Sequence, residues 1–344
     1  LLIIEGAMGL FDGAAPDGRG AVADLARKMS LPVVLVVDAG RMAGSVAPLV
    51  AGFAGYDASV RVAGVILNNV GSERHEAMLR RALAPLGLPV LAALRRSPDL
   101  AQPSRHLGLV QASERADLEA FLNTAADALG ATLDRNAILA LAAPLPAPGK
   151  AARLVPPAQV IAVAQDRAFG FAYPHMLGDW RAAGAELRMF SPLEDEPVPD
   201  AGFVFLPGGY PELHAGRLSN AHTFMQSLRI SAQNSDIYGE CGGYMTLGEG
   251  LIDADGTRHA MAGLLPLETS FATRKLHLGY QRLTAPDGPF RGAWAGHEFH
   301  YASTLRAEGP PLFAAQDAEG TALPDMGLKH SRVSGSFAHL IDRR

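Results

Sequence analysis

Short apolar runs that alternate with helical stretches constrain the fold of this chain more than any other feature. LLIIEGAMGLFDG opens the sequence, and LPVVLVVDAG (31–40), VRVAGVILNNV (60–70) and LGLPVLAAL (86–94) follow it. GAVADLARKM and SERHEAMLRRALAPL lie between these runs and have helical character. Continuous apolar strands that alternate with amphipathic helices indicate a parallel sheet covered on both faces. The sequence therefore predicts an α/β domain in residues 1–140.

The first residues differ from an ordinary N-terminus. The chain begins directly in an apolar run of the buried-strand type, without an initiator methionine or a preceding polar segment. We expect the sequence to be an N-terminally truncated piece of a longer protein. Its first domain would then lack its first part.

A proline-rich segment, LAAPLPAPGKAARLVPPAQ (141–159), divides the sequence into two halves. Neither a helix nor a strand tolerates prolines at that density, so we predict an interdomain linker. Residues 160–344 then resume the alternation, with VIAVAQD, AELRMFSP, GFVFLPGGYPE and SDIYGEC as strands around helical stretches. The last hundred residues contain shorter β-like pieces. We predict a second α/β domain over residues 160–344.

Composition excludes several classes of function. The formal net charge is -5 and the lysines and arginines are scattered, so no basic surface for nucleic acid or an anionic membrane is evident. One cysteine cannot form an internal disulfide, and neither a signal peptide nor a membrane-spanning apolar run is visible. We expect a cytoplasmic protein with small-molecule partners.

The single cysteine, Cys241, lies in YGECGGYM, between a predicted strand and a predicted helix. Glycines flank it, which is typical of the elbow that holds a strained nucleophile out into solvent. N–H groups at the start of the helix, where Gly242 lies, stabilise a thiolate and can bind an oxyanion. A buried, inert cysteine is the alternative, and the glycine frame favours catalysis.

A second glycine turn, in LPGGYPELHAG (206–216), also follows an apolar strand. Gly208 and Gly209 should therefore lie beside Cys241 at the carboxyl ends of the strands, where their N–H groups can face a developing oxyanion. A plain tight turn is the alternative.

The base that activates Cys241 should be a histidine, and the sequence offers three candidates. His297 and His300 lie in GHEFHYAS, and His339 lies in GSFAHLID. Spacing alone cannot choose among them, because the fold decides which imidazole comes within hydrogen-bond reach of the sulfur.

Seven segments together resemble one known family: EGAMGLFDG, GVILNNVGSERH, PSRHLGLV, LPGGYPELHAGRLSN, YGECGGYMTLGEGL, GHEFHYAS and GSFAHL. They are similar to the cobyrinic acid a,c-diamide synthase family, including its branch that acts on hydrogenobyrinic acid. The resemblance runs in order along essentially the whole chain. It implies an N-terminal ATP-dependent amidoligase domain, P-loop NTPase-like and related to dethiobiotin synthetase, and a C-terminal class I-like glutamine amidotransferase domain.

The resemblance also implies roles for residues of the second domain. Cys241 matches the thiol that attacks glutamine, and His339 matches the histidine that raises its nucleophilicity. His300 is the alternative base, and otherwise a structural or glutamine-positioning residue. Many amidotransferases carry a carboxylate two positions after the histidine, whereas Ile341 stands there and Asp342 comes one place later. The third member of the site is left unassigned.

In the first domain the resemblance gives Glu5 the role of the carboxylate that holds Mg²⁺ on bound ATP. Asp12 matches a position near the carboxylate being activated, and Asn68 matches an asparagine that contacts adenine. A turn aspartate and a strand-end asparagine are the ordinary alternatives. The phosphate-binding motif of this ligase class, G-x-x-x-x-G-K-[ST], occurs nowhere in residues 1–344.

The implied reaction has two connected stages. Cys241 forms a γ-glutamyl thioester from L-glutamine and releases ammonia, while ATP phosphorylates a side-chain carboxylate of hydrogenobyrinic or cobyrinic acid. Ammonia then displaces phosphate, and a second round yields the a,c-diamide of cobalamin biosynthesis.

Other functions are left open at this point. Cobyric acid synthase and nickel-sirohydrochlorin a,c-diamide synthase are related amidoligases, and a non-catalytic nucleotide-binding module of the partition-ATPase type is an alternative from another class. The intact GECGG segment argues against the last of these. The oligomeric state is open too, with a homodimer as one option.

Overall fold

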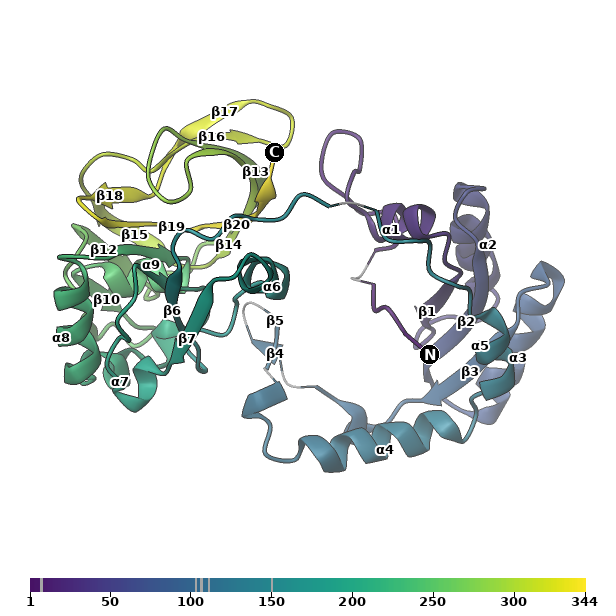
Figure 1. Ribbon diagram of the computed structural model, residues 1–344. Coiled ribbons are helices and arrows are strands. Elements are labelled where there is room, and N and C mark those ends of the chain that lie inside the picture. The colour runs from purple at the N-terminus through teal and green to yellow at the C-terminus, as the bar shows by residue number, and fades with distance from the viewer. Residues whose placement is uncertain (7–8, 103, 106–107, 111, 150) are drawn as a thin grey trace. The chain divides into compact units, whose positions relative to one another are not determined.

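The computed structural model describes residues 1–344 except 7–8, 103, 106–107, 111 and 150, and no side chain at 104–105, 108–109 or 113. The chain divides into two compact units, Leu1–Lys150 and Ala151–Arg344 (Figure 1). The boundary between the units lies inside the predicted linker, where residues 142–149 and 151–156 form neither helix nor strand. None of the helices in the described part of the chain has the length and apolar character needed to cross a bilayer.

The first unit contains a three-stranded parallel sheet in the order β1-β2-β3, within the described residues. Its strands are β1 (Val33–Asp38), β2 (Val62–Val70) and β3 (Val90–Arg95), and a two-stranded antiparallel pair, β4 (Ser104–Arg105) and β5 (Gly108–Leu109), follows them. Its helices are α1 (Val22–Met29), α2 (Val46–Tyr56), α3 (Glu73–Leu83), α4 (Leu118–Gly130) and α5 (Arg135–Leu141). The helices α2 and α3 contact each other, and α4 and α5 contact β3. Val65 and Leu67 of β2 are fully buried, as expected for a covered parallel sheet.

The strand predicted for the opening run is absent, and that prediction was wrong. Residues 1–6 have no regular secondary structure, and Leu1, Leu2 and Ile3 are 74%, 66% and 77% exposed. An apolar run becomes a stable strand only where a neighbour pairs with its backbone and a core covers its side chains. Neither β1 nor β3 pairs with these residues in the described structure. No strand therefore delivers Glu5 to an edge of the sheet.

The second unit is built on a six-stranded sheet in the order β18-β19-β9-β8-β6-β7, counted over the described residues. All neighbours in it are parallel except β18 and β19. Its strands are β6 (Val160–Ala164), β7 (Glu186–Phe190), β8 (Phe203–Leu206), β9 (Asp236–Glu240), β18 (Leu328–His330) and β19 (Val333–Ser336). The four predicted strands of this half correspond to β6, β7, β8 and β9, so the predicted α/β class is confirmed.

Side chains of the central strands alternate between two cores. Phe203 and Phe205 of β8 pack with Trp180 of α6 (Pro174–Ala182), whereas Val204 and Leu206 pack with the helices on the other face. Those helices are α7 (Ala215–Ser219), α8 (His222–Ser231) and α9 (Gly242–Leu247). The alternation follows from the two-residue period of a strand and leaves the sheet covered on both faces.

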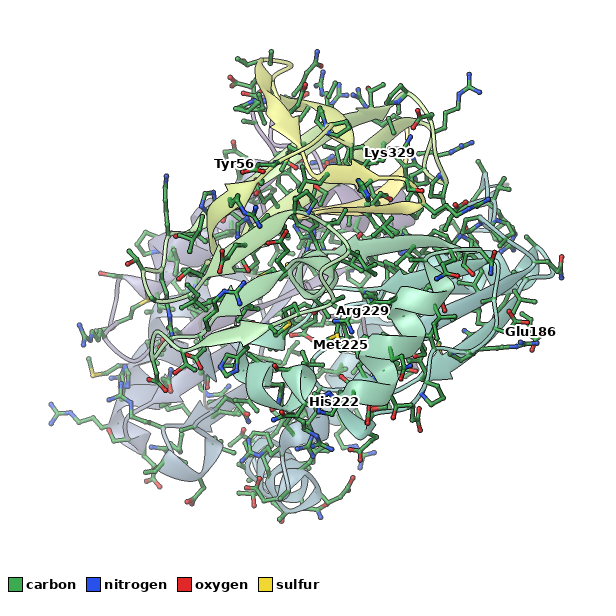
Figure 2. The ribbon with its side chains drawn as sticks, turned by 90° about the vertical axis from the view of Figure 1, so that its left-hand side faces the viewer. Tyr56, Glu186, His222, Met225, Arg229 and Lys329 are labelled. Carbon is green, nitrogen blue, oxygen red and sulfur yellow. The ribbon has the colours of Figure 1, made fainter. Side chains whose placement is uncertain are left out.

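One apolar and one charged side chain, four residues apart, anchor the helix α8 (Figure 2). Met225 is 4% exposed in the core, and the Arg229 guanidinium donates to the carbonyl oxygens of Met261 and Ala262. Spacings of three and four residues lie on one face of a helix, so this face of α8 is the one that packs.

Two further sheets complete the second unit in the described residues. The first has the antiparallel order β17-β16-β13-β14-β20, and the second has the order β11-β10-β12-β15. Their bounds are β10 (Gly250–Ile252), β11 (Arg258–Ala260), β12 (Leu267–Ser270), β13 (His277–Ala285), β14 (Gly292–His300), β15 (Ser303–Ala307), β16 (Phe313–Asp317), β17 (Ala322–Met326) and β20 (Ala338–Arg343). Leu283 and Trp294 of the five-stranded sheet pack into the same core as Trp180.

Candidate active site

Cys241 lies directly after β9 and is the N-cap residue of α9. Its backbone has φ 48° and ψ -102°, a conformation that costs a residue with a Cβ about 1–3 kcal/mol. Its N–H donates to the Ser336 carbonyl oxygen at 2.8 Å, which holds the turn. The strained elbow predicted from GECGG is present, but the residue is not held out into solvent, because Cys241 is only 1% exposed.

The glycines around the elbow allow α9 to start directly against the strand ends. A Cβ atom built on Gly243 would lie 1.9 Å from the carbonyl oxygen of Leu206, at the end of β8. One built on Gly239 would lie 2.6 Å from the carbonyl carbon of Gly243. Both contacts involve backbone that cannot move aside cheaply, so these positions require glycine.

The glycine turn after β8 lies against the thiol and the imidazole. A Cβ atom on Gly208 would lie 2.7 Å from Cε1 of His339 and 3.4 Å from Cβ of Cys241. One on Gly242 would lie 3.0 Å from the backbone nitrogen of Gly209. The structure thus brings Gly208, Gly209 and Gly242 together with Cys241 and His339, at the carboxyl ends of β8 and β9.

Glu240 supplies the carboxylate that the sequence left unassigned. Its side chain is buried, and Oε1 lies 3.1 Å from Nδ1 of His339. Its other oxygen, Oε2, accepts a hydrogen bond from the Leu340 N–H at 2.9 Å. The exposed Asp342 instead accepts from the N–H of Arg343.

Charge on Cys241 and Glu240 governs the protonation of His339. Burial disfavours the imidazolium, but the neighbouring thiolate and carboxylate outweigh that effect and raise the pKa of His339 to about 10. The ring therefore carries a proton at neutral pH. The arrangement is a buried pair of a cysteine sulfur and an imidazolium, with a carboxylate behind the imidazolium.

A second imidazole, His297 on β14, stacks on His339. The ring centroids are 4.8 Å apart with 5° between the planes, and the two residues are direct cross-strand partners. Nε2 of His297 lies 2.7 Å from the hydroxyl oxygen of Tyr173. Burial and the charge on His339 lower the pKa of His297 to about 4, so this ring is neutral. The sequence offered no signal for Tyr173 beyond its place before α6.

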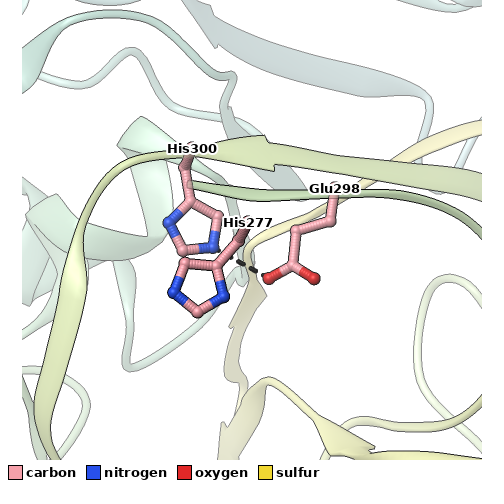
Figure 3. A group of neighbouring side chains, drawn as sticks. All are labelled: His277, Glu298 and His300. Carbon is pink, nitrogen blue, oxygen red and sulfur yellow. Dashed lines mark hydrogen bonds and ion pairs between the residues drawn. The ribbon is translucent and has the colours of Figure 1, made fainter. Parts of the chain in front are cut away.

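His300 lies elsewhere on β14, in a cluster with His277 and Glu298 (Figure 3). Its Nε2 pairs with Oε1 of Glu298 at 2.8 Å, and its ring stacks on Phe337 and on His277 at 3.8 Å and 4.6 Å. None of these described contacts is with Cys241. Of the three histidine candidates, the structure places His339 against the thiol.

The three residues singled out in the first unit are separate from one another. Glu5 and Asp12 are exposed, and the Asp12 carboxylate lies over Gly9, where a Cβ atom would be 1.8 Å from Oδ2. Asn68 lies within β2, which extends to Val70, and its Oδ1 accepts from the Asn69 N–H at 2.9 Å. Among the described residues, no hydrogen bond or ion pair joins Glu5, Asp12 and Asn68 to one another.

Comparison with known proteins assigns both halves of the chain. Residues 160–344 match the CobB/CobQ-like glutamine amidotransferase domain, and residues 1–104 match an AAA domain. Over 347 residues the chain is 55% identical to hydrogenobyrinate a,c-diamide synthase of Rhizobium meliloti (strain 1021), covering 99% of this chain and 80% of that protein.

The chain belongs to the hydrogenobyrinate a,c-diamide synthase family. Its identity to the enzymes of that name from Brucella abortus and Rhodobacter capsulatus is 54% and 51%, again over 99% of this chain and 80% of theirs. The resemblance given by the seven sequence segments is thereby confirmed. So is the expected combination of an AAA-type parallel-sheet domain with a glutamine amidotransferase domain in a glutamine-dependent ligase family.

Membership in the hydrogenobyrinate a,c-diamide synthase family implies ATP, and we tested whether the residues present fit Mg²⁺–ATP. A phosphate group needs a cradle of backbone N–H groups with a lysine, and the sequence contains no such motif. Glu5 and Asp12 are exposed. The residues of this sequence therefore lack a phosphate cradle of this kind.

Proposed function

We propose that this protein transfers the amide nitrogen of L-glutamine to the a and c side-chain carboxylates of hydrogenobyrinic or cobyrinic acid, in the cytoplasm, during cobalamin biosynthesis. Residues 160–344 act as the glutaminase and residues 1–140 as the ATP-dependent amidoligase, joined by the linker 141–159. The observation that carries the proposal is the buried Cys241–His339–Glu240 arrangement. The corrinoid substrate is supported by the relatives, which are hydrogenobyrinate a,c-diamide synthases.

The glutaminase chemistry begins with the thiolate of Cys241. Its sulfur attacks the side-chain amide carbon of glutamine, and the carbonyl oxygen takes the negative charge. As the tetrahedral intermediate collapses, the C–N bond breaks and the His339 imidazolium gives its proton to the leaving nitrogen, which departs as ammonia. A γ-glutamyl thioester remains on Cys241, and water, deprotonated by the now neutral His339, hydrolyses it to glutamate.

Two backbone amides support an oxyanion hole for this intermediate. The N–H of Gly242 opens α9, and the first N–H groups of a helix have no acceptor inside it. The nitrogen of Gly209 lies close by, as the 3.0 Å approach to a Cβ on Gly242 shows. We infer that both N–H groups bind the oxyanion, while Gly208 leaves room for the amide between Cys241 and His339.

Burial of the site favours transfer over loss of ammonia. Cys241 and His339 are 1% and 4% exposed, so ammonia is released where little water can protonate it.

Bound ATP supplies the chemistry that activates the acceptor carboxylate. From family membership we assign Glu5 to Mg²⁺, Asp12 to the region of the activated carboxylate and Asn68 to adenine.

Isotope labelling tests the proposed reaction. The protein is supplied with ATP, Mg²⁺, amide-¹⁵N glutamine and either hydrogenobyrinic or cobyrinic acid, and the product is analysed by mass spectrometry and NMR. We expect ¹⁵N at the a and c positions only. Label at other side chains would indicate a cobyric acid synthase-like activity, and glutamate formation without any labelled corrinoid would contradict the substrate assignment.

A further inference from the structure

Three side chains with metal-binding atoms meet on one face of the five-stranded sheet. His277 on β13 is the direct cross-strand partner of His300 on β14. Glu298 lies two residues before His300, and residues two apart on a strand point to the same face. Strand register alone therefore brings two imidazoles and a carboxylate together.

These three residues lie close enough to share one ion. One ligand atom from each lies within 4.8 Å of the others. Figure 3 shows the three side chains next to one another. The side chains of His300 and Glu298 are only 4% and 17% exposed. A cluster of this kind differs from a group of exposed acidic residues, because two of its members are largely withdrawn from water.

Gln281 holds the carboxylate from behind. Its Nε2 donates to Oε2 of Glu298 at 2.9 Å, and the Gln281 side chain is itself buried. Oε1 of Glu298 is therefore the oxygen that faces the imidazole of His300. Outer partners that orient a ligand in this way are a regular part of metal sites.

A cavity of about 500 Å³ opens beside the cluster. His277, Gln281, Glu298 and Asp325 are among the residues that line it. The cavity gives room for a water molecule or a small ligand on an ion held by the three residues. The carboxylates of Glu298 and Asp325 favour a cation there.

We propose that His277, Glu298 and His300 form a binding site for a divalent transition-metal ion of the Zn²⁺ type. Two imidazoles and a carboxylate with one open position form a known ligand set of Zn²⁺. The ion takes the place of the proton that Nε2 of His300 shares with Glu298, and this proton is released to solvent. Zn–N bonds of about 2.1 Å require the three ligand atoms to move to roughly 3.4 Å from one another, a shift that side-chain rotations can provide.

The metal site is distinct from the glutaminase site. Successive residues of β14 alternate between faces, so His297, which stacks on His339, points away from the face that carries Glu298 and His300. The proposal therefore does not depend on the reaction assigned above.

Metal titration tests the proposal. The purified, untagged protein is stripped with a chelator and titrated with Zn²⁺ against a chromophoric competitor. We expect one equivalent to bind in competition with the dye and to raise the melting temperature. His277→Ala should abolish binding of this Zn²⁺ ion. Gln281→Leu should lower the affinity for Zn²⁺ about 10–100-fold, because loss of a residue that orients a ligand has this effect in other metal sites.

His259→Ala is the matched control. His259 also pairs with a carboxylate, Asp253 at 2.8 Å, but belongs to no three-residue cluster of this kind among the described residues. This variant should keep the Zn²⁺ equivalent. Because His300 is buried, Glu298→Gln serves as a second ligand variant that preserves side-chain volume. Absence of a Zn²⁺ equivalent in the parent protein, or its retention at unchanged affinity in both His277→Ala and Glu298→Gln, would overturn the proposal.

Discussion

Glu240 holds His339 from a position next to the nucleophile in sequence. Glu240 ends β9, one residue before Cys241, and its carboxylate reaches Nδ1 of His339 on β20, a strand of the five-stranded sheet. Because Glu240 is 0% exposed, its charge acts on the imidazolium without screening by water. We therefore propose that Glu240 takes the place of a carboxylate two positions after the histidine.

Removing the charge of Glu240 should slow glutamine hydrolysis. In Glu240→Gln the His339 imidazolium loses its charged partner, so we expect kcat for glutamine hydrolysis to fall. Replacing the aspartate of a serine triad by asparagine lowers kcat by about 10⁴-fold. The loss here should be smaller, because a cysteine nucleophile depends less on its base than a serine does. Steady-state glutaminase assays measure the change. Asp342→Asn, which alters the exposed carboxylate near the chain end, should remain at the parent rate. Equal losses in the two variants would contradict the assignment of Glu240.

The raised pKa of His339 should also appear in the pH dependence of stability. An unfolded histidine titrates near 6.5, whereas folded His339 titrates near 10, so the stabilisation is complete below pH 6.5 and is lost as the pH rises through 10. We expect the free energy of unfolding of the second unit to fall between pH 7 and pH 10, and to fall less in His339→Gln. Both tryptophans, Trp180 and Trp294, lie in this unit, so their fluorescence during urea unfolding reports it. If the free energy of unfolding falls with the same slope against pH in the parent protein and in His339→Gln, the ion pair between His339 and its neighbours is contradicted.

At the scale of elements, β14 and α6 hold the catalytic strand β20 in position. His297 of β14 stacks on His339, and Tyr173, at the N-cap of α6, hydrogen-bonds His297. The neutral ring of His297 covers one face of the His339 ring. The orientation of the base is thus fixed by three elements that are distant in sequence.

Loss of the Tyr173 hydroxyl should loosen that stack. A single net hydrogen bond contributes about 0.5–1.5 kcal/mol, so we expect Tyr173→Phe to lower kcat for glutamine by roughly 2–10-fold. The pH profile of kcat should change as well, because His297 no longer has its partner. Tyr280→Phe, at a residue of β13 that is 58% exposed, is the control and should leave both rate and profile unchanged. A Tyr173→Phe enzyme with the parent profile would show that the contact does not position the base.

Patterns that depend on local sequence predicted these elements well. The apolar runs at β1, β2, β3, β6, β8 and β9 and the elbow at Cys241 follow from composition, periodicity and glycine placement. The opening run failed, because a strand also needs a neighbour to pair with. The choice among histidines and the role of Glu240 could not be predicted from spacing, because cross-strand register decides them. One signal was present in hindsight: Glu240 is a charged, buried residue at the end of its strand, directly before the nucleophile.

At the scale of the whole molecule, each unit has hydrophobic clusters of its own. The clusters around Trp180 and Phe224 belong to the second unit, and those around Val65 and Val60 belong to the first. The residues of the glutaminase site all lie in Ala151–Arg344. A mutation in the glutaminase site should therefore stop the release of ammonia from glutamine without stopping the amidation of the acceptor by ammonia.

The choice of nitrogen donor tests this separation. Cys241→Ala should abolish glutamine-dependent amidation and keep amidation at high ammonium concentration, because only the source of ammonia is lost. Product formation with each donor is followed by chromatography, with the parent protein as reference. Equal loss with both donors would show that Cys241 also serves the ligation.

Detection of the covalent intermediate tests the role of Cys241 most directly. The protein is mixed with glutamine, quenched in acid and digested, and the peptide that contains Cys241 is examined by mass spectrometry while glutamate release is measured in parallel. We predict a glutamyl adduct on that peptide in the parent protein, with neither adduct nor glutamate release in Cys241→Ala. Glutamate release at the parent rate from Cys241→Ala would contradict the proposed thiolate mechanism.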